Sequence, residues 1–141
     1  MSDPYSHDVL KLAGDIPHIG RLTDPDGSAH KVSRICGSEL TVDVNLDADH
    51  SIDEIGLVVK ACALGQASAS VLSRHAKGSK LDDVIEARDQ LKAMLQDDGM
   101  PPQGRFSDLV ALQGAAPYRQ RHGSILLAFD ATIAALSEAQ S

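Results

Sequence analysis

The sequence predicts a two-layer α+β domain, in which helices pack on one face of a short three-stranded antiparallel sheet. From Glu39 to Leu46 polar and apolar residues alternate at every position, which is typical of a strand with one buried face. After Cys62 apolar residues recur at helical spacing to the end of the chain. Strands followed only by helices favour segregated layers over alternating strand and helix units.

Composition favours a single domain over residues 1–141. A chain of 141 residues with 43% apolar residues can bury one core, and an aromatic content of 3% means that aliphatic side chains must build it. The formal net charge of -7 argues against a nucleic-acid partner. No apolar run reaches the roughly 18 to 20 residues that span a bilayer, and the first residues lack signal-peptide character. We therefore expect a cytoplasmic protein with no membrane partner.

The first elements follow from spacing and turn residues. Ser6 to Ala13 has helical spacing, and Gly14 and Pro17 end it. Ile19 to Leu22 favours a short first strand, and the next five residues are rich in turn formers. The chain should reverse there.

The following strands carry the two cysteines to their ends. A strand is expected from about Ala29 to Ile35, with Cys36 in the connection after it, and another from Ile52 to Lys60, just before Cys62. Neighbouring strands could bring the two thiols to one rim of the sheet. The alternating run between these strands should bury one set of side chains, Leu40, Val42, Val44 and Leu46, and expose the other, Glu39, Thr41, Asp43 and Asn45.

Helices make up the rest of the chain. The first should run from Gln66 to Ala76, and the second, capped by Ser79, should reach about Gln96. A loop and a short amphipathic segment follow. Pro117 is expected in the first turn of a terminal helix that ends near Ala139.

Cys62 is the residue with the strongest chemical signal. A thiol beside the first turn of a helix lies near unpaired backbone N–H groups and the positive end of the helix dipole, and both favour the thiolate. Such a sulfur can bind a metal or attack another sulfur. In a reducing compartment, Cys36 and Cys62 are a metal or redox pair, or buried thiols, more often than a structural disulfide.

Three segments of the chain form a recognisable pattern: Cys36-Gly37-Ser38, then Cys62 with Ala67-Ser68-Ala69-Ser70 behind it, and His122-Gly123-Ser124-Ile125-Leu126. Together they resemble the IscU/SufU/NifU-type iron-sulfur cluster scaffold proteins. In that family the first cysteine lies in Cys-Gly-Asp, the second in Gly-Cys, and a third opens the terminal helix. The resemblance covers most of the chain and implies that Cys36, Cys62 and His122 are ligands of a labile iron-sulfur cluster or iron, with zinc as an alternative.

The departures from that pattern reduce the ligand set. Ser38 stands where the family has aspartate, Ala61 replaces the glycine before the second cysteine, and Gly123 replaces the third cysteine. The IscU chaperone-recognition motif is also not recognisable. Zinc needs four ligands, or three and a water, and a two-iron cluster needs four. Ser38 would be a weak fourth ligand, whereas a homodimer that shares a cluster would supply four thiolates.

The resemblance implies a scaffold or carrier, not an enzyme. Its partners would be a cysteine desulfurase, which supplies sulfur, and recipient apo iron-sulfur proteins. Because Gly123 cannot accept sulfur, Cys36 or Cys62 would have to accept it, and Cys62 is the expected persulfide acceptor because it lies at a helix start. The alternative is a metal-free relative that acts as a protein-binding or regulatory partner. A hydrolase built on Cys62 and His122 would lack an orienting group and an oxyanion hole.

Overall fold

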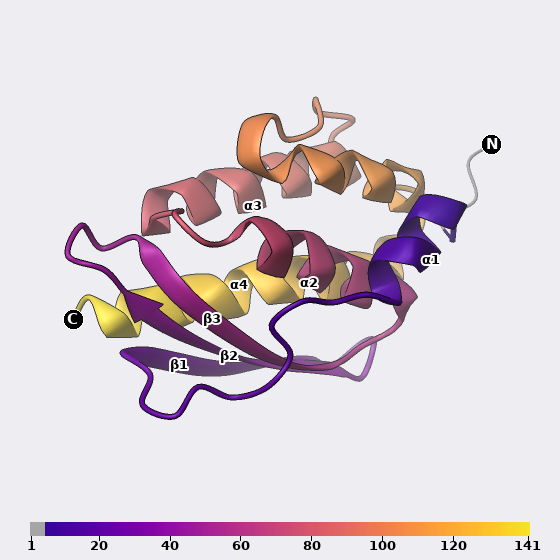
Figure 1. Ribbon diagram of the computed structural model, residues 1–141. Helices are drawn as coiled ribbons and strands as arrows, with labels where there is room; N and C mark the ends of the chain where they lie inside the picture. Colours follow the sequence, from indigo (N-terminus) through magenta and orange to yellow (C-terminus); the bar gives the residue numbers. More distant parts are fainter. Residues whose placement is uncertain (1–4) are drawn as a thin grey trace.

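Three antiparallel strands form the sheet in the computed structural model, which describes residues 5–141. The strands are β1 (Gly27–Ser33), β2 (Ser38–Leu46) and β3 (Ile52–Lys60), paired in the order β1-β2-β3. The helices lie on one side of this sheet (Figure 1). The two-layer α+β fold predicted from the sequence is confirmed.

The helical layer is organised around the terminal helix. Its elements are α1 (His7–Ala13), α2 (Ala63–His75), α3 (Leu81–Gln96), α4 (His122–Ala139) and two 3-10 helices, η1 (Gly104–Ala115) and η2 (Arg119–Arg121). Helix α4 packs across β1 and β2, and α2 and α3 pack against α4 (Figure 1). Among the described residues no helix is long and apolar enough to cross a membrane.

The core lies between β2 and α4. Every second side chain of β2 from Leu40 to Val44 is fully buried, as the alternation predicts. From α4, Ile125 and Phe129 point into the same core. The ring of Phe129 meets that of Phe106 edge to face, with centroids 5.6 Å apart, so η1 is joined to the core by an aromatic contact.

The outer face of β2 is not uniformly exposed, and the expectation that Asp43 is solvated is wrong. The Asp43 carboxylate is buried and accepts hydrogen bonds from Arg21 Nε at 2.7 Å and from the Ser28 hydroxyl at 2.6 Å. The backbone N–H of Leu22 donates to it at 3.0 Å. A loop that approaches from the open face therefore covers this carboxylate.

Gly56 lets that loop cross the sheet. It lies opposite Asp43 in the β2-β3 register, and a Cβ at Gly56 would be 2.5 Å from the Gly20 carbonyl oxygen. The strand expected at Ile19–Leu22 is wrong, because the described chain forms only one parallel bridge there, between Ile19 and Leu57. The segment leaves the sheet edge to reach Asp43 instead of continuing along β3.

Two helix starts differ from the sequence prediction. Helix α2 begins at Ala63, three residues earlier than expected, with Cys62 as its N-cap. Helix α3 is capped at Lys80, whose N–H donates to the Asp83 carboxylate at 2.8 Å. The Ser79 hydroxyl instead donates to a carbonyl of the preceding turn. The predicted Ser79 cap is therefore wrong.

The terminal helix also starts later than expected. Pro117 is outside α4, which begins at His122. Tyr118 has a non-helical backbone, with φ -98° and ψ 71°, and the short helix η2 follows it. This break places His122 in the first turn of α4.

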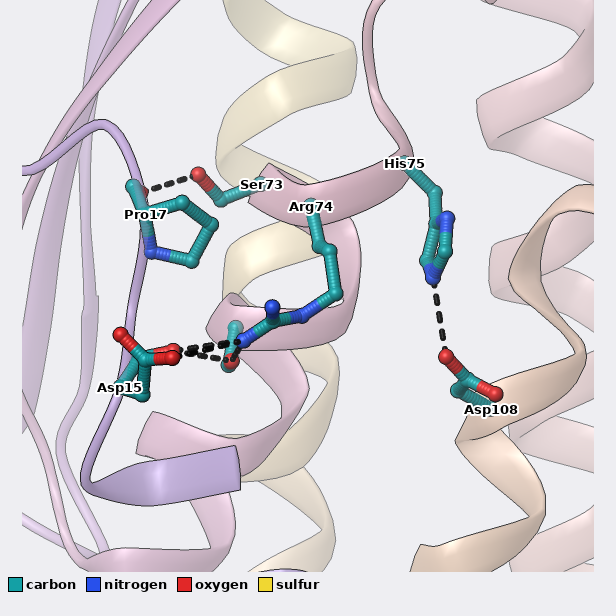
Figure 2. Close-up of polar contacts among 7 residues, drawn as sticks. Asp15, Pro17, Ser73, Arg74, His75 and Asp108 are labelled. Atoms are coloured by element: carbon teal, nitrogen blue, oxygen red, sulfur yellow. Dashed lines mark hydrogen bonds and ion pairs between the residues drawn. The ribbon is translucent and has the colours of Figure 1, made fainter. Parts of the chain in front are cut away.

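Polar contacts anchor the C-terminal half of α2 (Figure 2). The Ser73 hydroxyl donates to the Pro17 carbonyl, and Arg74 donates to the Asp15 carbonyl at 2.7 Å. His75 Nε2 lies 2.9 Å from an Asp108 carboxylate oxygen of η1. The Asp15 to Pro17 segment and η1 therefore fix the C-terminal end of α2, the helix that has Cys62 as its N-cap.

We expect the buried Asp43 to make stability pH-dependent. Burial raises the pKa of Asp43, but the hydrogen bonds from Arg21, Ser28 and the Leu22 N–H outweigh it, so the pKa falls below its ordinary value of 3.8. A lowered folded-state pKa stabilises the fold above the unfolded-state pKa, and this contribution is lost as the pH falls through the folded-state value.

Asp43→Asn should therefore lower the free energy of unfolding by about 1 to 3 kcal/mol at neutral pH. Urea unfolding at pH 7 and at about pH 3 measures this difference, which should shrink at the lower pH. The matched control is Asp53→Asn, which changes an exposed carboxylate on β3. Equal losses for both variants, or a loss for Asp43→Asn that does not depend on pH, would contradict the assignment.

Candidate functional site

Strand register brings the two cysteines to one rim of the sheet. Ser33 at the end of β1 pairs with Ser38 at the start of β2, so Cys36 lies in the turn between them. Glu39 pairs with Lys60, the last residue of β3, and Cys62 follows two residues later. The strand ends thus meet at the same edge, as the strand order in the sequence indicated.

The two thiols contact η2 and the first turn of α4. Cys36 Sγ lies 2.7 Å from the carbonyl oxygen of Gln120, to which it donates, and Cys62 Sγ lies 3.5 Å from the hydroxyl of Ser124. The two cysteines are therefore gathered around one short segment, Gln120 to Ser124, although they come from different connections. The Gln120 to Ser124 segment therefore lies at the rim together with the two connections that carry Cys36 and Cys62.

Ser124 is the central polar group of this rim, and sequence reasoning gave it no role. Its buried hydroxyl lies 2.8 Å from the Ser38 hydroxyl as well as 3.5 Å from Cys62 Sγ. Gly65 makes this approach possible, because a Cβ at that position would collide with the Ser124 hydroxyl. A glycine one turn into a helix that begins with cysteine is the signal that could have indicated this close approach.

The environment of Cys62 favours its thiolate. Burial raises the pKa of the Cys62 thiol, but the N–H groups of Gly65 and Leu64, the Ser124 hydroxyl and the positive charge of Arg121 together lower it below 9.0. These groups stabilise the negative charge of the thiolate at the N-terminal end of α2. The expectation of a helix-start thiolate is therefore supported by the geometry.

Cys36 lies in a more accessible position. Its thiol is half-buried, and the adjacent Ile35 is 82% exposed. Gly37 follows with φ +69°, a left-handed conformation that glycine adopts without strain. The β1-β2 turn thus presents Cys36 at the surface beside the more enclosed Cys62.

His122 is not turned toward the thiols. Its ring is buried, and Nε2 lies 2.9 Å from the Ala116 carbonyl oxygen and 3.3 Å from that of Ala115. A carbonyl oxygen only accepts, so Nε2 carries the hydrogen. Within residues 5–141 no three side chains of His, Cys, Asp or Glu are grouped to hold a metal ion. The structure brings Cys36 and Cys62 together but does not add His122 to them.

Two of the three positions that depart from the family pattern, Ser38 and Gly123, also lie at the rim. The Ser38 hydroxyl is engaged by Ser124 and is fully buried. A Cβ at Gly123 would lie 2.9 Å from the Ser33 hydroxyl oxygen at the end of β1. A side chain at position 123 would therefore point into the same end of the sheet.

Comparison with known proteins identifies relatives over nearly the whole chain. The family model of the NifU-like N-terminal domain matches residues 4–124. The crystal structure of a NifU-like protein (N-terminal) from Brucella abortus has a TM-score of 0.93 and 38% identity, and the match covers 96% of this chain and 94% of that one. A putative iron-sulfur cluster assembly scaffold protein for the SUF system from Fervidobacterium islandicum shares the fold, with a TM-score of 0.84 at 18% identity. That match covers 94% of this chain and 96% of that one.

Curated relatives are more distant in sequence. The iron-sulfur cluster assembly scaffold protein IscU 1 of Archaeoglobus fulgidus is 26% identical over 100 residues, which are 70% of this chain and 63% of that protein. The IscU scaffold protein of Streptococcus pyogenes is 26% identical over 96 residues, 68% of this chain and 60% of that protein. The matches thus span less than two thirds of these relatives. With the family model matched over residues 4–124, the chain belongs to the NifU-like N-terminal domain family of the IscU/SufU/NifU scaffolds.

Proposed function

We propose that this protein is an iron-sulfur cluster assembly scaffold or carrier that uses Cys36 and Cys62 as its thiolate ligands. The observation that carries the proposal is the contact of both thiols with the Gln120 to Ser124 segment at one rim. Its relatives are named as assembly scaffolds, which supports the same role. The protein would carry iron or a labile cluster in the cytoplasm, and it would not act as an enzyme.

His122 is proposed as a third ligand that joins only after a rearrangement. Because Nε2 donates to the Ala115 and Ala116 carbonyls, the other ring nitrogen, Nδ1, would be the ligand atom. The ring would have to move toward the thiols, since among the described residues the three side chains are not grouped to hold a metal ion. Ser38 would be a weak ligand, because Ser124 already engages its hydroxyl. With only two thiolates in place, iron would be held loosely, and zinc could use the same ligands with water. Loose binding suits a carrier that must pass its cluster to recipient apo iron-sulfur proteins.

Cys62 is the proposed sulfur acceptor. Its thiolate would attack the outer sulfur of a persulfide on a cysteine desulfurase. The S–S bond of that persulfide would break, leaving the desulfurase thiolate and a persulfide on Cys62. The lowered pKa of Cys62 supports this step, and Gly123 has no thiol to compete for the sulfur.

Metal content is expected to depend on both cysteines. After anaerobic reconstitution with iron and sulfide, Cys36→Ser and Cys62→Ser should each lose most of the bound iron, because a neutral hydroxyl replaces a thiolate. His122→Ala should lose less, since His122 is turned away in the structure. Iron, zinc and acid-labile sulfide per chain are the measured quantities.

His7→Ala is the matched control for the histidine variant, because His7 is exposed at the start of α1. No metal on the reconstituted wild-type chain would contradict the proposal. That result would instead favour a metal-free relative that acts as a protein-binding or regulatory partner.

A shared cluster should produce a homodimer. Two chains would supply four thiolates through Cys36 and Cys62 of each, which completes the ligand set of a two-iron cluster. Light scattering of the anaerobic, reconstituted protein should then give twice the chain mass, and a chelator should return it to one chain. A monomer that retains its iron and sulfide would rule out the shared cluster.

Sulfur transfer should depend on Cys62 more than on Cys36. Incubation with a cysteine desulfurase and cysteine should add one sulfur atom per chain, detected by mass spectrometry after mild alkylation. Cys62→Ser should reduce this loading to background, whereas Cys36→Ser should retain most of it. Undiminished loading of Cys62→Ser would place the acceptor elsewhere.

A further inference from the structure

A cavity of about 720 Å³, open to solvent, lies between α3 and the start of α4. It is next to the rim of the sheet that carries Cys36 and Cys62, which we call the thiol rim. Helix α3 contributes one wall, and η2 with the first turn of α4 contributes the other. Its lining comprises eight residues, Arg88, Lys92, Gln96, Asp97, Arg119, His122, Gly123 and Leu126. None of the roles proposed above for the cysteines involves this cavity.

The cavity is basic in an acidic protein. Arg88, Lys92 and Arg119 line it together with a single carboxylate, Asp97. The whole chain has 13 basic and 20 acidic residues, so basic side chains are in excess here against the composition of the protein. A concave surface with an excess of positive charge concentrates anions near it.

The three cations differ in how they are held. Arg88 Nε lies 2.9 Å from an Asp130 carboxylate oxygen, and its Nη1 lies 3.5 Å from Asp89, so its charge is balanced and its side chain is fixed. Lys92 and Arg119 make no side-chain hydrogen bond or ion pair with any other residue in the part of the chain that the structure describes. Their charges are therefore available to a ligand.

Packed side chains form the floor of the cavity, since Leu126 and His122 are each 6% exposed. The Lys92 and Arg119 side chains are solvent-exposed, so their attraction to an anion is screened by salt and is strongest at low ionic strength. A volume of this size also falls within the range of about 300 to 1,000 Å³ that is usual for small-molecule sites.

We infer that this cavity binds a small anion with at least two oxyanion groups, either carboxylates or phosphates. Lys92 comes from α3 and Arg119 from η2, on opposite walls, so a ligand with two anionic groups can pair with both. The planar guanidinium of Arg119 suits a carboxylate or phosphate in particular. Two anionic groups also outweigh the repulsion from Asp97.

A bound anion would lie next to the scaffold site. Gly123 lines the cavity, and a Cβ at Gly123 would point to Ser33 at the thiol rim. His122, the first residue of α4, also lines the cavity and is the proposed third ligand of the scaffold site. The inference does not depend on metal binding, so its test uses the metal-free chain.

Isothermal titration calorimetry of the metal-free, reduced, full-length protein at low ionic strength tests the inference. Citrate and pyrophosphate distinguish a polycarboxylate ligand from a phosphate ligand, and acetate is the single-charge control. Lys92→Gln and Arg119→Gln should each weaken binding of the preferred probe by about five- to ten-fold. Asp97→Asn should strengthen it by about two- to three-fold, because it removes the opposing charge.

The matched control is Lys31→Gln, which removes one positive charge from an exposed position on β1, away from the cavity. It should leave the affinity unchanged. Equal weakening by Lys31→Gln, equal binding of acetate, or no binding of either citrate or pyrophosphate at millimolar concentration would overturn the inference. An effect of Asp97→Asn opposite in sign to that of Lys92→Gln excludes general unfolding as the cause.

Discussion

The thiol rim depends on the close approach of Ser124 to Cys62 and Ser38. This approach requires Gly65, because any side chain there would occupy the place of the Ser124 hydroxyl. The same close packing holds α2 against α4, where the Ser68 hydroxyl donates to the Ile125 carbonyl at 2.6 Å. The contact that positions the Cys62 sulfur is therefore also a contact between two core helices. The geometry of the site and the stability of the fold are consequently linked.

The start of α4 combines two chemical environments. On one side Gln120 and Ser124 contact the two thiols, and on the other Arg119 and His122 line a basic cavity. Gly123 lies between them and has no side chain to separate them. The Ser33 hydroxyl closes the rim side of this position, since a Cβ there would lie 2.9 Å from it.

Local patterns in the sequence predicted the elements well where one interaction dominated. The alternation along β2 led to the buried set from Leu40 to Val44, because side-chain burial on a strand has a period of two. The prediction failed at Ile19–Leu22, which has strand-like composition but leaves the sheet edge to reach Asp43. It also failed at Pro117, where a favourable first-turn residue is followed by a non-helical Tyr118. At both places the tertiary structure requires a backbone conformation that differs from the one the local residues favour.

The sequence by itself determined the three main strands, the presence of a helix after Cys62 and the resemblance to the scaffold family, since these depend on neighbouring residues and short motifs. Only the tertiary structure decided which side chains meet. It buried Asp43 beneath a loop, turned His122 toward backbone carbonyls, and joined Ser38 to Ser124. These outcomes depend on distances between residues far apart in the chain, and those distances follow from helix packing that no local pattern encodes.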